Sequence, residues 1–165
     1  MAELVTRKTR LLSMIGDHFT MCMVCVPIAI FFYPVAAKGA FYLMLAPYLN
    51  KDFLRGRSPI KCLLGLQLQN SAGAPANELS AFLRNVTAMV WPVEVLLIAL
   101  GSQKRLGDYI AGTQVATNIV TTSTCSWRQE LIAYRVTPYT IYTLLATLLY
   151  LLLLHGLFMW IGIGL

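Results

Sequence analysis

Charged residues are scarce in this chain of 165 residues. Asp, Glu, Lys and Arg together make up 12% of it, whereas soluble globular chains carry about 25%. Between His18 and Ala37 none of the four occurs, and 58% of all residues are hydrophobic. This composition excludes an ordinary soluble domain and predicts a single integral membrane domain.

Catalytic and nucleotide-binding motifs are also missing. The chain has no phosphate-binding glycine loop, no H-E-x-x-H zinc motif and no nucleophile elbow. We therefore expect no enzymatic activity, no cofactor and no metal site. The net charge is +6, but no zinc-finger spacing or aromatic-interleaved basic motif accompanies it, so we expect no nucleic-acid partner. Basic residues beside apolar segments instead indicate membrane topology and contacts with anionic lipid headgroups.

The four cysteines give no disulfide framework. Cys22 and Cys25 form a C-x-x-C inside an apolar segment, without the soluble βαβ setting of a redox motif. We interpret the pair as small apolar packing residues, with redox or metal chemistry as the alternative. Cys62 and Cys125 are expected to be lone cysteines.

Four apolar segments are candidates for membrane spans, at residues 11–33, 39–49, 86–100 and 139–163. The second is shorter than the roughly 20 residues that a helix needs to cross a bilayer. We expect residues 11–55 to form a helical hairpin that turns outside the cytoplasm. Residues 137–165 are expected to form an additional C-terminal transmembrane helix. No cleavage site follows the basic N-terminus, so the first segment is expected to remain in the mature protein.

The third segment, which contains Pro92, leaves two topologies open. A plain crossing places five of the 13 basic residues outside the cytoplasm, whereas a re-entrant segment places only Lys38 there. An excess of Lys and Arg marks the cytoplasmic side and favours re-entry, while hydropathy alone favours crossing. The sequence thus predicts an all-α, multi-pass integral membrane protein with its N-terminus in the cytoplasm. It has three or four transmembrane helices, and the third segment is re-entrant or short.

Two polar segments, residues 61–69 and 108–116, repeat one pattern with a glycine and a glutamine in step. In each, a glycine suited to end a helix precedes an alternating stretch that is compatible with a short strand. When the two segments are aligned, Leu68 of the first matches Val115 of the second. We expect the two strands to pair in a small β-ribbon on the cytoplasmic side of the membrane.

The stretch Ser126-Trp127-Arg128-Gln129 fits a helix-capping box. It predicts an interfacial connector helix within residues 121–136. Pro138 disfavours helical geometry at the residue before it, so this helix is expected to end by Thr137. The connector would lead directly into the last span.

Asp17 stands at the border of the first apolar segment, seven residues after Arg10. That separation is about two helical turns, or roughly 10 Å, too far for an ion pair within one helix. A carboxylate at the edge of hydrocarbon is costly without a cationic partner. Each of the two residues is therefore expected to find its partner in a distant part of the fold.

These residues begin a resemblance to the RDD family of small bacterial membrane proteins, which is named for one arginine and two aspartates. The block from Arg10 to Asp17 is similar to the first family motif, with Ser13 where alanine is usual. Residues 56–65, G-R-S-P-I-K-C-L-L-G, resemble the central motif and include Lys61, although isoleucine precedes that lysine where the family has glycine.

Residues 104–113, K-R-L-G-D-Y-I-A-G-T, resemble the closing motif of the family and supply Arg105 and Asp108. The resemblance covers about residues 10–120. It implies an all-helical membrane domain in the cytoplasmic (inner) membrane of a bacterium, with a transport-related role. Some members of the family are described as cation/proton antiporters.

A transport-related function requires ionisable groups that exchange protons or cations near the membrane. Asp17, Glu94, Asp108 and His155 are the candidates, because burial and neighbouring charge can bring such groups to titrate near neutral pH. The cations Arg10, Lys61 and Arg105 complete the candidate charge network. We therefore expect a membrane transport-related protein with proton or cation coupling through buried carboxylates.

The same residues can instead have purely structural roles. Arg10 or Arg105 would then pair with Asp17 or Asp108, Glu94 would lie among lipid headgroups, and His155 would make an interhelical hydrogen bond. The alternative function is a non-catalytic assembly or scaffold subunit whose last span docks against another membrane protein. In both cases the small number of spans favours a homo-oligomer or a complex with other membrane subunits.

Overall fold

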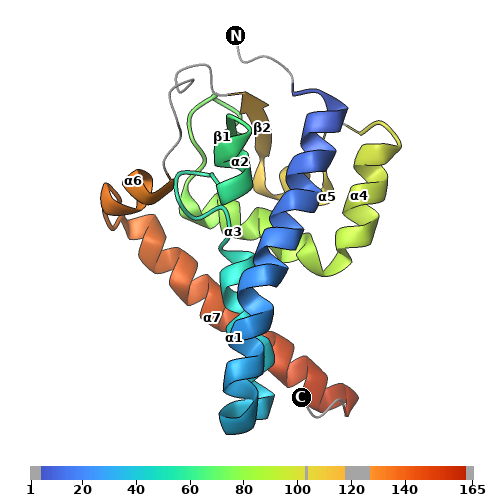
Figure 1. Ribbon diagram of the computed structural model, residues 1–165, viewed down its shortest axis with the longest axis vertical. Helices are drawn as coiled ribbons and strands as arrows, with labels where there is room; N and C mark the ends of the chain where they lie inside the picture. Colours follow the sequence, from blue (N-terminus) through green and yellow to red (C-terminus); the bar gives the residue numbers. More distant parts are fainter. Residues whose placement is uncertain (1–4, 103, 118–126, 163–165) are drawn as a thin grey trace.

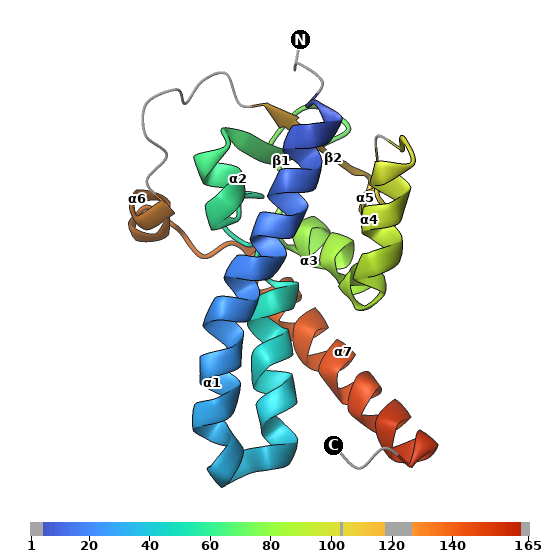
Figure 2. The ribbon, with the colours of Figure 1, turned by 45° about the vertical axis from the view of Figure 1, so that its right-hand side comes forward.

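The computed structural model describes residues 5–102, 104–117 and 127–162 of a mostly helical chain. The elements form two parts, which we call the stem and the head (Figures 1 and 2). The stem consists of a helical hairpin and the C-terminal helix. The head lies at the end that carries the N-terminus and holds the shorter helices and two strands.

Helix α1 (Arg7–Leu49) supplies both arms of the hairpin. Thr6 caps its start by accepting a hydrogen bond from the Thr9 N–H at 3.3 Å. Figure 2 shows the chain turning back at the far end of the stem, between a first arm (Arg7–Pro34) and a second arm (Gly39–Leu49). Proline lacks the N–H that a helix interior requires, so Pro34 suits the position where the first arm ends. The expected hairpin is therefore present.

Helix α7 (Pro138–Ile161) is the second long apolar helix. Thr137 caps its first turn, proline occupies the first helical position, and Gly162 ends it in a left-handed conformation. The first arm of α1 and α7 are the two helices of the described residues that are long and apolar enough to cross a membrane. The sequence predicted three or four such helices; a third is reached only if residues 78–99, which are bent, form one span. A buried cluster of Leu45, Leu49, Phe82 and Leu154 joins α7 to the second arm and to the head.

Strands β1 (Leu66–Asn70) and β2 (Thr113–Thr117) pair antiparallel, with Leu68 opposite Val115. Each follows a short helix, α2 (Pro59–Leu63) or α5 (Leu106–Ala111), and a left-handed glycine. The β-ribbon predicted from the repeated sequence pattern is thus confirmed. Its inner face packs with Ala76 and Ala81 in a small core that closes the head.

The segment expected as one apolar piece over residues 86–100 is divided. Helix α3 (Glu78–Val86) and a 3-10 turn (Thr87–Val90) precede α4 (Trp91–Ala99), and α3 and α4 meet at 94°. Pro92 lies in the first turn of α4, where its missing N–H costs nothing. Helix α3 was not predicted, although Leu79, Phe82, Leu83 and Val86 have the i, i+3, i+4, i+7 spacing of an amphipathic helix and Asn77 caps its start.

Helix α6 (Trp127–Ile132) corresponds to the predicted connector but ends five residues short of Thr137. The chain between α6 and α7 is held to α3 by Tyr134, whose hydroxyl donates to Glu78 Oε1 at 2.9 Å. Residues 121–126 of the predicted connector lie outside the described residues.

We predict that Gly107→Ala destabilises the head, because α5 crosses α3 at this glycine. A Cβ atom at position 107 would lie 2.0 Å from the carbonyl oxygen of Arg84. Relieving this overlap should cost about 3 kcal/mol of unfolding free energy. The measurement is thermal unfolding of the purified protein in a neutral detergent.

Gly156→Ala is the matched control, because Gly156 is also helical and has open space around its Cα. That variant should be neutral or slightly more stable, since alanine favours helix by up to about 1 kcal/mol. Equal unfolding midpoints for the two variants would contradict the close packing of α5 on α3.

Candidate functional site: a buried charge cluster

The head contains ten basic or acidic side chains that are each at most 7% exposed. One of them, Arg57, pairs with the partly exposed Glu130 at the edge of the head, and we call the other nine the charge cluster. Its five cations are Arg10, Lys51, Lys61, Arg84 and Arg105, and its four carboxylates are Asp17, Asp52, Glu94 and Asp108. They come from the first arm of the hairpin, from α2 to α5, and from the loops after the second arm and before α5. Six of the seven side chains predicted as a charge network lie in this cluster.

Asp17 lies where the first arm of α1 passes α2. Its carboxylate pairs with the Lys61 ammonium and accepts a hydrogen bond from the Ser58 hydroxyl at 2.5 Å. Ser58 also caps α2 and so fixes Lys61 beside Asp17. The expected cationic partner from a distant segment is therefore present, but it is Lys61 rather than an arginine.

Asp108 sits in the first turn of α5, where its carboxylate pairs with Arg10 and with Arg84 Nε, the latter at 2.5 Å. The backbone N–H of Arg105 also donates to it, at 3.2 Å. Burial alone would raise the pKa of Asp108, but Arg84, Arg105 and Arg10 outweigh burial and lower it to about 2. Asp108 is therefore ionised at neutral pH.

Asp52 connects the two sites just described. Its carboxylate accepts from Lys61 Nζ at 2.7 Å and from Arg84 Nη1 at 2.9 Å. Burial alone would raise the pKa of this carboxyl, yet Lys61 and Arg84 hold it well below its usual range. The result is an unbroken chain of alternating charge, Asp17–Lys61–Asp52–Arg84–Asp108–Arg10.

Glu94 and Arg105 form the remaining pair of the cluster, with Arg105 Nη1 3.5 Å from Glu94 Oε2. Glu94 also accepts hydrogen bonds from the Thr87 hydroxyl at 2.5 Å and from the Gly107 N–H at 3.2 Å. At 1% exposure it does not lie among lipid headgroups, so that interpretation is wrong. The 94° bend between α3 and α4 brings this carboxylate back into the head.

Lys51 is the exception in the cluster. Within the described part of the chain its ammonium makes no ion pair. It lies 4.6 Å from the ring centroid of Tyr48, at the end of the second arm. Burial, reinforced by the positive charge of Arg105, lowers the pKa of Lys51 to about 7, although Asp52 acts in the opposite direction.

Sequence reasoning missed Lys51, Asp52 and Arg84. Lys51 and Asp52 directly follow the second apolar segment, a position that also suits solvated charges at a membrane surface. Arg84 is only 1% exposed and contacts two aspartates, but no short motif marks it. Its place in the alternating chain depends on contacts between residues far apart in sequence.

His155, the seventh predicted side chain, lies outside the cluster on α7. Its Nδ1 atom is 2.9 Å from the hydroxyl of Tyr42 on the second arm, which fits an interhelical hydrogen bond. Cys25 is buried, and Cys22 Sγ lies 3.7 Å from Nε2 of His18. Cys62 is disulfide-bonded, so the expectation of a lone cysteine there is wrong; Cys125 lies outside the described residues.

No group of three or more His, Cys, Asp or Glu side chains in the described ranges could hold a metal ion. Comparisons with known proteins add nothing to this picture, since no family model, curated protein or solved structure matches the chain. The charge cluster is thus the candidate site, and its described chemistry is a network of buried ion pairs.

We predict that Asp108→Asn strongly destabilises the head, because Arg10 and Arg84 would keep their charge while losing a carboxylate. Breaking a buried ion pair by removing one partner costs about 3–5 kcal/mol. The wild-type contribution of Asp108 should be complete above about pH 4 and fade as the pH falls towards 2. Thermal unfolding in neutral detergent across this pH range measures both effects.

Glu130→Gln is the control for this substitution, since Glu130 pairs with Arg57 at the edge of the head with 19% of its side chain exposed. Its loss should lower the unfolding free energy less than that of Asp108, because Glu130 is partly solvated and pairs with one arginine, whereas the fully buried Asp108 pairs with Arg10 and Arg84. If Asp108→Asn were no more damaging than Glu130→Gln, the alternating chain would not be a structural requirement.

Proposed function

We propose that this chain is a multi-pass helical protein of the bacterial cytoplasmic membrane with a transport-related role. The composition of the stem supports the membrane setting. Its outward side chains are apolar, for example Phe31 at 77% and Trp160 at 84% exposure. Water would make such a surface unstable, whereas lipid would solvate it.

The arrangement of the head supports a cytoplasmic N-terminus and a re-entrant third segment. After α4 the chain returns to the start of α1, where Gly101 lies beside the guanidinium of Arg7. Both ends of the α3–α4 pair therefore lie in the head. In this topology Lys38 is the one basic residue at the far end of the hairpin, as the distribution of Lys and Arg favours.

Membership of the RDD family is part of this proposal. The three sequence blocks that resemble its motifs converge in space, since Arg10, Asp17, Lys61, Arg105 and Asp108 all belong to the charge cluster. Residues so far apart in sequence need not meet. Their convergence supports reading the three blocks as one functional unit.

The observation that carries the transport-related role is the unpaired lysine. The cluster holds five cations and four carboxylates, so its charge is balanced when Lys51 is neutral. With its pKa lowered to about 7, Lys51 can gain or lose a proton under physiological conditions. Asp108, which the sequence proposed for such exchange, is less suited to it, because its arginine partners depress its pKa.

Protonation of Lys51 would also change the ion pairs that hold the helices of the head together. The added charge attracts the adjacent Asp52, which already binds Lys61 of α2 and Arg84 of α3. Lys51 further lines an apolar cavity of about 680 Å³ that is bordered by the second arm, α6 and α7. A proton taken up here can therefore change the ion pairs of the head beside a cavity of the stem, which is the coupling that transport requires.

We predict that Lys51→Met abolishes proton movement in proteoliposomes under an imposed pH gradient, read with an enclosed pH-sensitive dye. Lys51→Arg should fail as well, because a guanidinium keeps its proton at neutral pH. Lys8→Met, which removes an exposed lysine, is the control and should behave like the wild type. Proton movement in Lys51→Met at the wild-type rate would refute the proposed exchange.

The same variant gives a prediction for stability. The pKa of Lys51 is about 7 in the folded state, whereas the ordinary value of 10.5 applies to the unfolded state. Between pH 7 and pH 10.5 the unfolded state therefore binds more protons than the folded state. The unfolding free energy should therefore rise with pH across this window, by up to about 1.4 kcal/mol per pH unit. In Lys51→Met this rise should be absent, as measured by denaturant unfolding in detergent at several pH values.

A second candidate function is that of an assembly subunit, and the exposed surface of α7 favours it. This helix contacts the rest of the chain along one narrow face, which includes Thr143, Thr147 and Leu154, while its leucines on the other faces are exposed. Under this hypothesis, α7 would dock against another membrane protein. Replacing the exposed Leu145, Leu149 and Leu153, which do not line the cavity beside Lys51, with alanine should then release co-purifying subunits from detergent extracts without affecting proton movement.

A further inference from the structure

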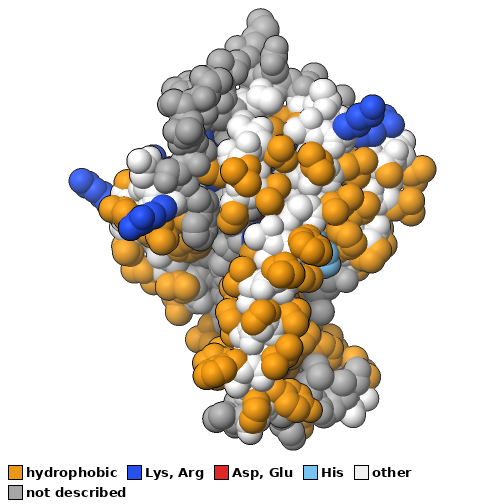
Figure 3. Space-filling view, in the orientation of Figure 1, with side chains coloured by type: hydrophobic (Ala, Val, Ile, Leu, Met, Phe, Trp, Pro, Cys, Tyr) orange, Lys and Arg blue, Asp and Glu red, His pale blue; other side chains and the backbone are white. Residues whose placement is uncertain are grey.

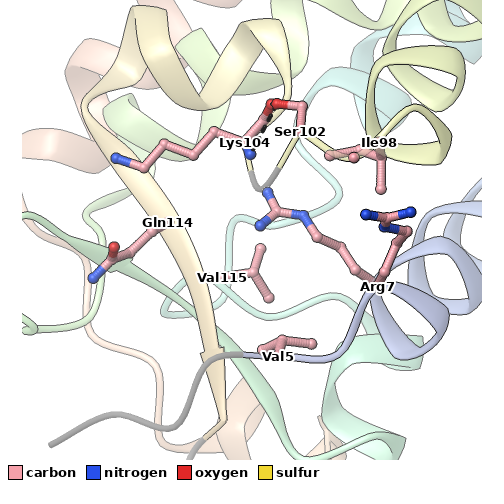
Figure 4. Close-up of a pocket in the computed structure, with 9 residues that line it drawn as sticks. Val5, Arg7, Ile98, Ser102, Lys104, Gln114 and Val115 are labelled. Atoms are coloured by element: carbon pink, nitrogen blue, oxygen red, sulfur yellow. Dashed lines mark hydrogen bonds between the residues drawn. The ribbon is translucent and has the colours of Figure 1, made fainter.

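A second polar site lies at the start of α1, outside the ion pairs of the charge cluster. It is a cavity of about 200 Å³ between the first turn of α1, the loop after α4 and strand β2 (Figure 4). Its polar lining consists of Arg7, Arg10, Ser102, Lys104 and Gln114, with no acidic side chain among the described lining residues. We call it the basic cavity.

The cations of the basic cavity are not neutralised equally. Arg10 pairs with Asp108 at the back of the cavity. For Arg7 and Lys104 the described part of the chain supplies no ion pair, and Figure 4 shows the Arg7 guanidinium extending into the cavity. Two basic groups thus remain to attract an anion from outside the chain.

The helix itself increases this positive potential. The first turn of α1 contains Arg7, Lys8 and Arg10 and no acidic residue. Cations at a helix N-terminus face the positive end of the helix dipole, an arrangement that costs stability unless an anion offsets it. An anion bound at Arg7 would supply that offset.

The loop after α4 is shaped to place these groups. Gly101 has a φ of +113°, and a Cβ atom there would lie 3.1 Å from Arg7 Nη2, so glycine gives the guanidinium its space. The Ser102 hydroxyl donates to the Lys104 carbonyl oxygen and accepts from the Lys104 N–H at 3.3 Å. These bonds tighten the loop that carries Lys104 to the edge of the cavity.

The position of the basic cavity indicates what kind of anion it meets. The first arm of α1 contains 28 residues from Arg7 to Pro34, which rise about 42 Å. The arm is thus long enough to cross the hydrocarbon core, about 30 Å thick, and to extend beyond it at the N-terminal end. Arg7 therefore lies on the headgroup side of the membrane, where lipid phosphates are found.

An apolar surface leads up to the cavity from the membrane side. Leu12 and Ile15 of α1 are half or more exposed, as are Leu96 and Leu100 of α4, the last directly before Gly101. Figure 3 shows hydrophobic side chains over the upper parts of both helices on one face of the molecule. A phospholipid combines the same two features, since its acyl chains are apolar and its phosphate is anionic.

We propose that the basic cavity binds the phosphate of an anionic phospholipid, with the acyl chains along the exposed apolar side chains of α1 and α4. Arg7 and Lys104 contact the phosphate, and Ser102 and Gln114 offer hydrogen bonds. This inference rests on the proposed membrane setting but not on proton exchange at Lys51. A negative result for lipid binding at the basic cavity can therefore be distinguished from a negative result for proton exchange at Lys51.

The test is native mass spectrometry of the purified protein in neutral detergent, titrated with dioleoylphosphatidylglycerol or zwitterionic dioleoylphosphatidylcholine. We expect tighter binding of the first anionic lipid. The double variant Arg7→Gln/Lys104→Gln should weaken that binding by about tenfold or more, because two charged contacts with phosphate are lost. The already weaker binding of the zwitterionic lipid should fall by a smaller factor, because its choline cation offsets part of the attraction between its phosphate and these residues.

The matched control is Lys8→Gln/Arg55→Gln, which removes two exposed positive charges that do not line the cavity. An equal loss of anionic lipid binding in this control would overturn the proposal, since general surface charge would then explain the effect. Unchanged binding in Arg7→Gln/Lys104→Gln would also overturn it.

A third arm separates lipid from soluble phosphate. Inorganic phosphate in the millimolar range, compared with chloride at equal ionic strength, should not raise the unfolding temperature of the wild type in detergent. A phosphate-specific increase that disappears in Arg7→Gln/Lys104→Gln would assign the cavity to a soluble ligand and refute the lipid assignment. Proton movement in proteoliposomes is measured separately and decides only the function proposed for Lys51.

Discussion

The structure of the head depends on one chain of ion pairs, in which aspartates alternate with lysine or arginine from Asp17 to Arg10. A buried charge without a partner is far more costly than a buried pair, so each member needs its neighbours. The chain joins the first arm of α1 to α2, α3 and α5. The positions of these helices are therefore coupled through electrostatics as well as through apolar packing.

Much of the architecture follows from local sequence signals. The hairpin, the last helix and the β-ribbon each have such a signal, in apolar length, in proline positions or in the repeated glycine pattern. Helix α3 also has one, since Leu79, Phe82, Leu83 and Val86 lie at helical spacing after the Asn77 cap. Its polar residues Arg84 and Asn85 are nevertheless buried. Their burial is explained only by partners in other segments, and a single sequence does not contain that information.

Some features of the candidate site could also be predicted from the sequence, whereas others depend on contacts between distant segments. Sequence reasoning found Asp17 and required a distant cation for it, but it could not choose Lys61 over an arginine, because spacing along the chain does not encode distance between elements. It also placed Glu94 among headgroups as one interpretation, whereas the bend between α3 and α4 buries that carboxylate. Which buried charge makes no ion pair among the described residues, as is true of Lys51, becomes visible only when the pairs in the folded chain are known.

The order of residues in the ion-pair chain has a consequence for biosynthesis. Arg10 and Asp17 are translated first, but their partners lie 98 and 44 residues later in the chain. In the proposed membrane setting, the hairpin would enter the bilayer before the ribosome has made Asp108. The nascent protein must therefore keep both early charges hydrated at the membrane surface until the head closes around them.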